Sequence, residues 1–98
     1  MSLRAVVHPL FDRDVNAATA WYRERQAGLA ERFERRLNAC LSEIEERPES
    51  FQLARGQLRQ ARLHDFPYGV VFELVGDFLL IYGVFHTARD REVWDSRT

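Results

Sequence analysis

Lysine is missing from this 98-residue chain, in which all 14 basic side chains are arginines. A biased genomic base composition is one ordinary cause of such a replacement. The chemical consequence is the same whatever the cause, because a guanidinium group stays protonated near neutral pH and binds oxyanions as a planar fork. The sequence therefore excludes a lysine general base and a lysine Schiff base.

Cysteine and long hydrophobic runs are also scarce. Cys40 is the only cysteine, which excludes an internal disulfide and a cysteine-based zinc site and agrees with a reducing compartment. No apolar run approaches the roughly 18 residues that a membrane span requires, and the first residues lack the apolar core of a signal peptide. We expect a soluble, cytoplasmic protein.

Neither sign of charge dominates. The 14 basic and 15 acidic residues give a formal net charge of −1 and a sequence pI near 6.3, whereas domains that bind nucleic acids usually have a pI above about 9. A chain of this length has room for one hydrophobic core, and it contains no repeat, low-complexity tract or flexible linker. We expect a single domain over residues 1–98.

The first half of the chain has the periodicity of a short strand followed by two helices. Residues 4–8 are apolar enough for a strand, and apolar side chains recur at helical spacing over residues 11–26 and 29–47. Asp12 and Asp14 suit the positive N-terminal end of the first helix. Only two residues separate the helices, so we expect a helical hairpin, whose second helix buries Phe33, Leu37, Cys40, Leu41 and Ile44.

The second half changes to the period of β-strands. Residues 58–64 alternate, residues 69–75 are rich in β-branched and aromatic side chains, and residues 78–86 are apolar at nearly every position. A Gly-Asp pair at residues 76–77 predicts a two-residue hairpin turn. We expect both faces of the last strand to be covered, and we expect the sheet to contribute Val70, Phe72, Leu80 and Val84 to the core.

This order of elements predicts an α+β fold in which the N-terminal helical hairpin packs on one face of a small, mainly antiparallel sheet. The other face of the sheet is expected to be open. The polar tail over residues 87–98 carries Trp94 as its only large apolar side chain.

Known catalytic motifs are absent. The chain has no P-loop, no dinucleotide-binding glycine motif, no nucleophile elbow and no zincin helix motif. His8, His64 and His86 stand at no metal-ligand spacing with an acidic residue or the cysteine, so ordinary surface or strand-end positions explain them best. We expect no metal site and no cofactor. The adjacent Trp21 and Tyr22 have two interpretations, as core residues or as a binding platform, and the core is the commoner one.

Two groups of polar residues are candidate contact sites. In the alternating strand, either Arg62 together with Gln60 and His64, or else Arg59, would face a shallow groove on the open side of the sheet. The second group follows the last strand and combines arginines with a tryptophan, a composition that favours contact with carboxylates, phosphates or a partner helix. Its members are His86, Arg89, Arg91, Trp94 and Arg97. The alternative for this group is a solvated tail with Trp94 packed back onto the sheet.

Four motifs, taken in order, resemble the RelE/ParE superfamily of bacterial type II toxins, which are found in plasmid-stabilisation modules. They are Ala20-Trp21-Tyr22, Gly28-Leu29 with Phe33, residues 59–63 leading into Phe66-Pro67-Tyr68, and His86-x-x-Arg89-Asp90 followed by Trp94 and Arg97. No motif is specific by itself, but the ordered set covers nearly the whole chain. The resemblance implies a compact sheet with an N-terminal helical hairpin, the same fold that the periodicity predicts.

The superfamily contains two kinds of toxin. RelE-like members are ribosome-dependent endoribonucleases that cleave mRNA, and ParE-like members inhibit DNA gyrase. For the nuclease, the resemblance implies lysines at the positions of Gln60 and Arg62, an arginine at Gly69 and a tyrosine at Trp94. RNA cleavage needs a proton acceptor, a proton donor and cations for the phosphorane charge, and here only Arg62 and Arg89 remain as candidate catalytic residues. The near-neutral charge also suits a ribosome poorly.

The resemblance therefore favours a ParE-like toxin, a non-enzymatic inhibitor of DNA gyrase that is neutralised by a cognate antitoxin. The alternatives are a RelE-like mRNA endoribonuclease and an inactive remnant that binds only the antitoxin. We expect the target to be bound by Arg59, Arg62, His86, Arg89, Trp94 and Arg97. We expect the antitoxin to be bound through arginines of the helical hairpin, namely Arg25, Arg32, Arg35 and Arg36.

Overall fold

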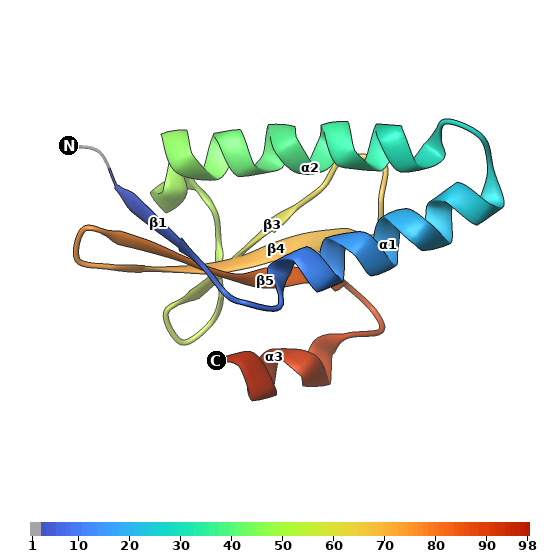
Figure 1. Ribbon diagram of the computed structural model, residues 1–98. Helices are drawn as coiled ribbons and strands as arrows, with labels where there is room; N and C mark the ends of the chain where they lie inside the picture. Colours follow the sequence, from blue (N-terminus) through green and yellow to red (C-terminus); the bar gives the residue numbers. More distant parts are fainter. Residues whose placement is uncertain (1–2) are drawn as a thin grey trace.

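The computed structural model, which describes residues 3–98 apart from the side chains of residues 91–93, has a mixed sheet between two layers of helix (Figure 1). The five strands lie in the order β1-β5-β4-β3-β2. In chain order the elements are β1 (Arg4–Val7), α1 (Phe11–Arg25), α2 (Leu29–Glu46), the 3-10 turn η1 (Pro48–Ser50), β2 (Leu53–Arg55), β3 (Leu58–Arg62), β4 (Tyr68–Val75), β5 (Phe78–His86) and α3 (Arg91–Arg97).

The sheet is mainly antiparallel, as the periodicity predicts. The pairs β2–β3, β3–β4 and β4–β5 are antiparallel, and the edge strand β1 runs parallel to β5. The turn between β4 and β5 falls at the expected Gly-Asp pair, where Gly76 has a φ of 58°. A left-handed backbone of this kind favours glycine. The short strand β2 is an element that the sequence pattern did not predict.

The helical hairpin packs on one face of the sheet, and its buried side chains form the main core (Figure 1). Phe33, Leu37 and Ile44 of α2 are buried as expected, whereas Leu41 is only partly buried. Cys40 is buried beside them. A left-handed glycine before α2 (Gly28, φ 83°) turns the chain between the two helices.

The expectation that Leu80 belongs to this core is wrong. The pairing of β4 with β5 shifts by one residue, because Val71 lies opposite Gly83 while Phe72 lies opposite Ile81. This β-bulge reverses the alternation of β5, so that the strand presents Leu79, Ile81 and Val84 to the helices. Leu80 therefore lies on the other face of the sheet, where it is only partly buried.

The second face of the sheet is covered in part by α3, below the sheet in Figure 1. Trp94 packs against a small cluster of Leu58, Val71 and Phe85. The expectation that both faces of β5 are covered is thus confirmed near Phe85, whereas Phe78 at the start of the strand is 43% exposed. The expectation of a fully open second face is corrected. Within residues 3–98, no helix combines the length and the apolar character needed to cross a membrane.

Candidate functional site

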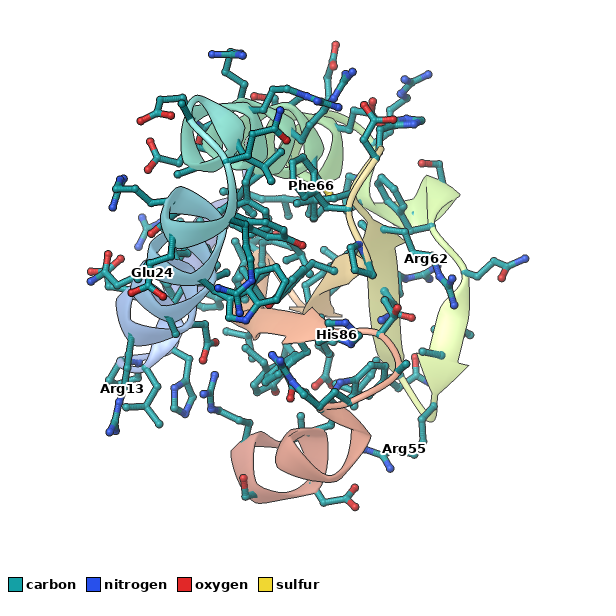
Figure 2. The ribbon with its side chains drawn as sticks, turned by 90° about the vertical axis from the view of Figure 1, so that its right-hand side faces the viewer. Arg13, Glu24, Arg55, Arg62, Phe66 and His86 are labelled. Atoms are coloured by element: carbon teal, nitrogen blue, oxygen red, sulfur yellow. The ribbon has the colours of Figure 1, made fainter. Side chains whose placement is uncertain are left out.

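A groove of about 560 Å³ lies between β3, the segment that leads through β2, and α3. Figure 2 views the molecule from the side on which Arg62 and His86 lie near the end of the sheet, with Arg55 next to α3. The groove is lined by Ser50, Phe51, Gln52, Leu53, Ala54, Gln60, Arg62, Thr87 and Trp94. Of the residues that alternation over 58–64 assigns to one face, Gln60 and Arg62 line this groove and His64 does not.

Arg62 and Gln60 reach the groove because they share one face of β3. Their partners across the strand pair are Gly69 and Val71. A Cβ atom on Gly69 would lie 2.8 Å from Nε2 of Gln60, so the glutamine side chain lies across the glycine backbone. The groove therefore brings together Gln60, Arg62 and Trp94, with Gly69 directly beside Gln60. These are the four positions that the resemblance pairs with the two lysines, the arginine and the tyrosine of the nuclease type.

The groove has little capacity for proton transfer. Arg62 is the only ionisable side chain among the described residues that line it. A guanidinium holds its proton near neutral pH, so Arg62 binds anions but does not serve as a general acid or base. Amide and hydroxyl groups supply the remaining polar contacts. This chemistry suits recognition of an acceptor-rich surface.

Trp94 is packed back onto the sheet, which confirms the second of the two alternatives for the C-terminal tail. Its ring centroid lies 6.3 Å from that of Phe85, and the Arg55 guanidinium lies 5.6 Å from the same centroid. Arg55 also pairs with Asp95 at 2.7 Å. The indole N–H is buried and has no hydrogen-bond partner among the described residues. Trp94 thus forms a fixed wall of the groove.

Arg59 does not face the groove. It lies opposite Phe72, on the side of the sheet that carries the helical hairpin. Its Nη1 donates a hydrogen bond of 2.6 Å to the carbonyl oxygen of Phe51. The groove is therefore lined by Arg62 and not by Arg59. Arg59 instead binds the backbone of the segment that precedes β2.

Arg97 is buried, which corrects the expectation of an exposed, target-binding side chain. Its side chain is 7% exposed and forms a bidentate ion pair with Asp14, whose own side chain is 13% exposed. The hydrogen bond to Asp14 raises the pKa of Arg97 above its ordinary value. At the level of sequence, Asp14 is assigned only a favourable interaction with the positive N-terminal end of α1. The contact between Asp14 and Arg97 is not predicted there.

His86, Arg89 and Asp90 form a compact turn after β5. The backbone amides of Ala88 and Arg89 donate to Nδ1 of His86 at 3.3 and 3.1 Å. Burial acts to raise the pKa of the Asp90 carboxyl, but hydrogen bonds from Arg89 and from the His86 amide outweigh it and hold that pKa below its usual value. Arg89 also donates to the Tyr68 hydroxyl at 3.4 Å. His86 therefore accepts hydrogen bonds within this turn, and the Arg89 side chain is 62% exposed. The side chain of Arg91, the other arginine expected in this group, lies outside the described residues.

The arginines expected to meet an antitoxin lie on the exposed side of the helical hairpin. Arg36 and Arg32 approach the same Asp65 oxygen at 2.8 and 3.6 Å. With Arg35 they border a hollow of about 400 Å³. Arg25 does not belong to this cluster. It lies at the end of α1, where its guanidinium carbon is 4.1 Å from the centroid of the Trp21 ring.

The three histidines and the cysteine do not converge. Across the described part of the chain, no three His, Cys, Asp or Glu side chains lie close enough to hold a metal ion. Burial raises the pKa of the Cys40 thiol to about 11, as expected for an inert cysteine. Tyr22 lies in the core, as the commoner interpretation expects, whereas Trp21 is 46% exposed.

Comparison with known proteins identifies the family of this chain. Residues 5–91 match the family model of the ParE toxin of the type II toxin–antitoxin system parDE. The chain belongs to this family. No curated protein matches the sequence.

Two solved structures share the fold. The chromosomal ParDE toxin–antitoxin system from P. aeruginosa contains a chain with a TM-score of 0.73 and 12% sequence identity, covering 87% of this chain and 96% of that one. A mutant of the E. coli toxin RelE in its free state gives a TM-score of 0.57 at 18% identity, covering 99% of this chain and 95% of that one. The predicted superfamily and its fold are thus confirmed.

Proposed function

We propose that this type II toxin acts by binding DNA gyrase in the cytoplasm, within a plasmid-stabilisation or related module, and that it does not cleave RNA. The groove beside β3 supports the proposal. Its described lining supplies one arginine and several neutral donors, at the positions where a nuclease needs proton carriers. A binding surface needs no proton transfer, so this composition is compatible with a toxin that inhibits gyrase by binding to it.

Purified gyrase provides the direct test. We expect the toxin to inhibit supercoiling of relaxed plasmid DNA, and we expect Arg62→Ala to weaken that inhibition about tenfold or more. Arg13→Ala is the matched control, because Arg13 is an exposed arginine of α1 that does not line the groove. Arg89→Ala tests whether the target surface extends from the groove to the turn after β5.

Induced expression separates gyrase inhibition from RNA cleavage. Gyrase inhibition leads to filamentation and a DNA-damage response with intact mRNA. Site-specific mRNA cleavage on ribosomes, detected by primer extension and lost in Arg62→Ala, would establish the RelE-like alternative instead. A chain that causes neither effect and still binds its antitoxin would be the inactive remnant.

The antitoxin is the second part of the proposal. On α2, Arg32 and Arg36 share one carboxylate partner, Asp65, and Arg35 borders the same hollow. One shared carboxylate does not neutralise three arginines, so this cluster retains positive charge for a partner's carboxylates. Arginine binds carboxylates through two parallel hydrogen bonds. We expect the product of an adjacent small gene to co-purify with the toxin, and we expect Arg35→Glu with Arg36→Glu to weaken the complex. If the neighbouring product never binds and the chain alone is harmless, the toxin–antitoxin function fails.

A further inference from the structure

The face of the sheet opposite the helical hairpin carries an apolar patch at the end next to the β4–β5 turn. Leu79 points to the helices, so its neighbours Phe78 and Leu80 point to the opposite face. Side chains that pair across strands share a face, which adds the partners of these two residues on β1 and β4. We call this set the turn-end patch, and its members are Arg4, Val6, Glu73, Val75, Phe78 and Leu80.

The apolar members of the turn-end patch are open to solvent because α3 covers only the other end of β5. The β4–β5 turn extends well beyond α3 (Figure 1). Val6 is 48% exposed, Val75 47% and Phe78 43%. Neighbouring exposed apolar side chains, bordered by charges, are typical of a surface that meets a protein partner.

The two charged members of the patch stand at opposite corners of it. Arg4 lies on the edge strand β1 at the level of the turn, and Glu73 lies two strands away on β4 and two residues further from the turn. Within the described part of the chain, Arg4 has no ion-pair partner, although Asp77 lies in the turn nearby, and Glu73 accepts only the neutral Tyr82 hydroxyl, at 3.0 Å. Both corners therefore keep their charge for a partner.

We propose that the turn-end patch joins two copies of this chain face to face, as a two-fold homodimer. A two-fold interface brings the same patch of both subunits together, so each contact between two different residues forms twice. An axis along the other diagonal of the patch, from Val6 to Val75, sets Arg4 of each copy against the partner's Glu73. The apolar side chains between the corners then close over each other between two ion pairs. The patch is thus complementary to itself, which selects a second copy as its occupant.

The dimer is independent of the surfaces described above. The turn-end patch shares no residue with the described lining of the groove or with the arginine cluster of α2. The inference therefore does not depend on the proposed function. Because stable interfaces usually take about 20–30 residues from each side, a patch of this size predicts a weak dimer, with a dissociation constant on the order of micromolar.

Charge reversal followed by mixing tests this geometry. Sedimentation equilibrium of the wild-type toxin should show a particle of twice the 11.5 kDa of one chain. Arg4→Glu and Glu73→Arg each set like charges together at both corners, so each variant should dimerise at least tenfold more weakly. An equimolar mixture of the two variants should regain the wild-type affinity, because the mixed dimer has opposite charges at both corners. Arg13→Glu, at an exposed arginine of α1, is the control and should change dimerisation less than twofold.

Other results overturn the inference. A wild-type toxin that stays monomeric up to about 100 μM does not form this dimer. A dimer that survives both reversals uses another surface, such as the open edge of β1, and a mixture that stays monomeric shows that the two corners do not meet.

A second substitution decides the matter if a reversed variant does not fold. Phe78→Ser removes the exposed ring in the centre of the patch, and Leu53→Ser makes a similar change at an exposed position of β2. We expect only Phe78→Ser to weaken the dimer. Equal dimerisation of these two variants contradicts the proposal, as does a monomeric toxin whose antitoxin affinity falls with Phe78→Ser, because the patch then belongs to the antitoxin.

Discussion

Asp14 and Arg97, 83 positions apart in the sequence, form a bidentate ion pair that joins the first turn of α1 to the last turn of α3. The pair also serves the β-bulge of β5. Oδ2 of Asp14 accepts a hydrogen bond from the Val84 amide at 3.2 Å, and Nη1 of Arg97 donates to the Tyr82 carbonyl oxygen at 3.0 Å. The bulge disturbs the ladder at these residues, so the ion pair satisfies backbone groups that would otherwise be buried without partners.

Removing one member of this pair is expected to destabilise the protein strongly. Arg97→Ala or Asp14→Ala leaves an unpaired buried charge, a defect that costs about 3–5 kcal/mol. The double variant Asp14→Leu with Arg97→Met should lose less than the sum of the two single variants, because it leaves no buried charge. Urea denaturation followed by far-UV circular dichroism measures these differences.

An exposed ion pair supplies the control for that measurement. Arg23 and Glu34 approach only to 4.0 Å, and both side chains are largely exposed. Such pairs contribute about 0–1 kcal/mol, so Arg23→Ala should leave the denaturation midpoint nearly unchanged. Equal effects of Arg23→Ala and Arg97→Ala would contradict the structural role of the buried pair.

Gly83 is expected to be required by the same contact. A Cβ atom at this position would lie 2.5 Å from both Nη1 of Arg97 and Oδ2 of Asp14. Gly83→Ala should therefore push the two charged groups away from the bulge and lower the melting temperature. The control is Gly69→Ala, where the added Cβ meets only the flexible Gln60 side chain. Gly69→Ala should lower the melting temperature less than Gly83→Ala does, and adding Gln60→Ala should recover most of that smaller decrease. If Gly83→Ala melts at the same temperature as the wild type, the contact with Arg97 and Asp14 relaxes without cost.

The packing of the hairpin on the sheet gives a further prediction. Leu37 is 4% exposed in the centre of the α2 face that meets the sheet. Leu37→Ala should cost about 2–5 kcal/mol through lost burial and the cavity left behind. Leu53→Ala is the comparison, since Leu53 lies on the edge strand β2 and about half of its side chain is exposed. A stability loss below about 1 kcal/mol for Leu37→Ala would be inconsistent with this core.

Local patterns in the sequence predict the helices and the long strands, but they do not predict the β-bulge in β5. The helical hairpin follows from the spacing of apolar residues, and β5 runs over residues 78–86 as expected. An unbroken apolar strand carries no sign of a one-residue bulge, which is why Leu80 was assigned to the wrong face. The three residues of β2 are exposed, so they lack the alternation by which a strand is recognised.

The candidate site divides along the same line. Alternation along β3 predicts that Arg62 and Gln60 share one face of the strand and that Arg59 lies on the other. It leaves open which of these faces meets the groove, and the fold decides for Arg62 and Gln60. The burial of Arg97 depends on Asp14 at the other end of the chain, and no local pattern reports such a pairing.

Cys40 allows a prediction about alkaline pH. Burial raises the pKa of its thiol from 9.0 to about 11, so between these values the folded protein keeps a proton that the unfolded chain releases. Since the unfolded state then binds fewer protons, stability falls as pH rises. The thiol's contribution is complete below pH 9 and is lost on approaching pH 11. Cys40→Ala should therefore show a shallower loss of stability between pH 9 and pH 11 than the wild type.

Chemical reactivity checks the same burial independently. Because the thiolate is the reactive form of cysteine, Cys40 should react with a disulfide reagent at pH 8 only about as fast as the protein opens. Addition of urea to the unfolding midpoint should accelerate the reaction many-fold. Rapid labelling of the folded protein, at the rate of a free thiol in a peptide, would mean that α2 does not keep Cys40 against the Ala61 carbonyl, to which its sulfur lies 3.7 Å away.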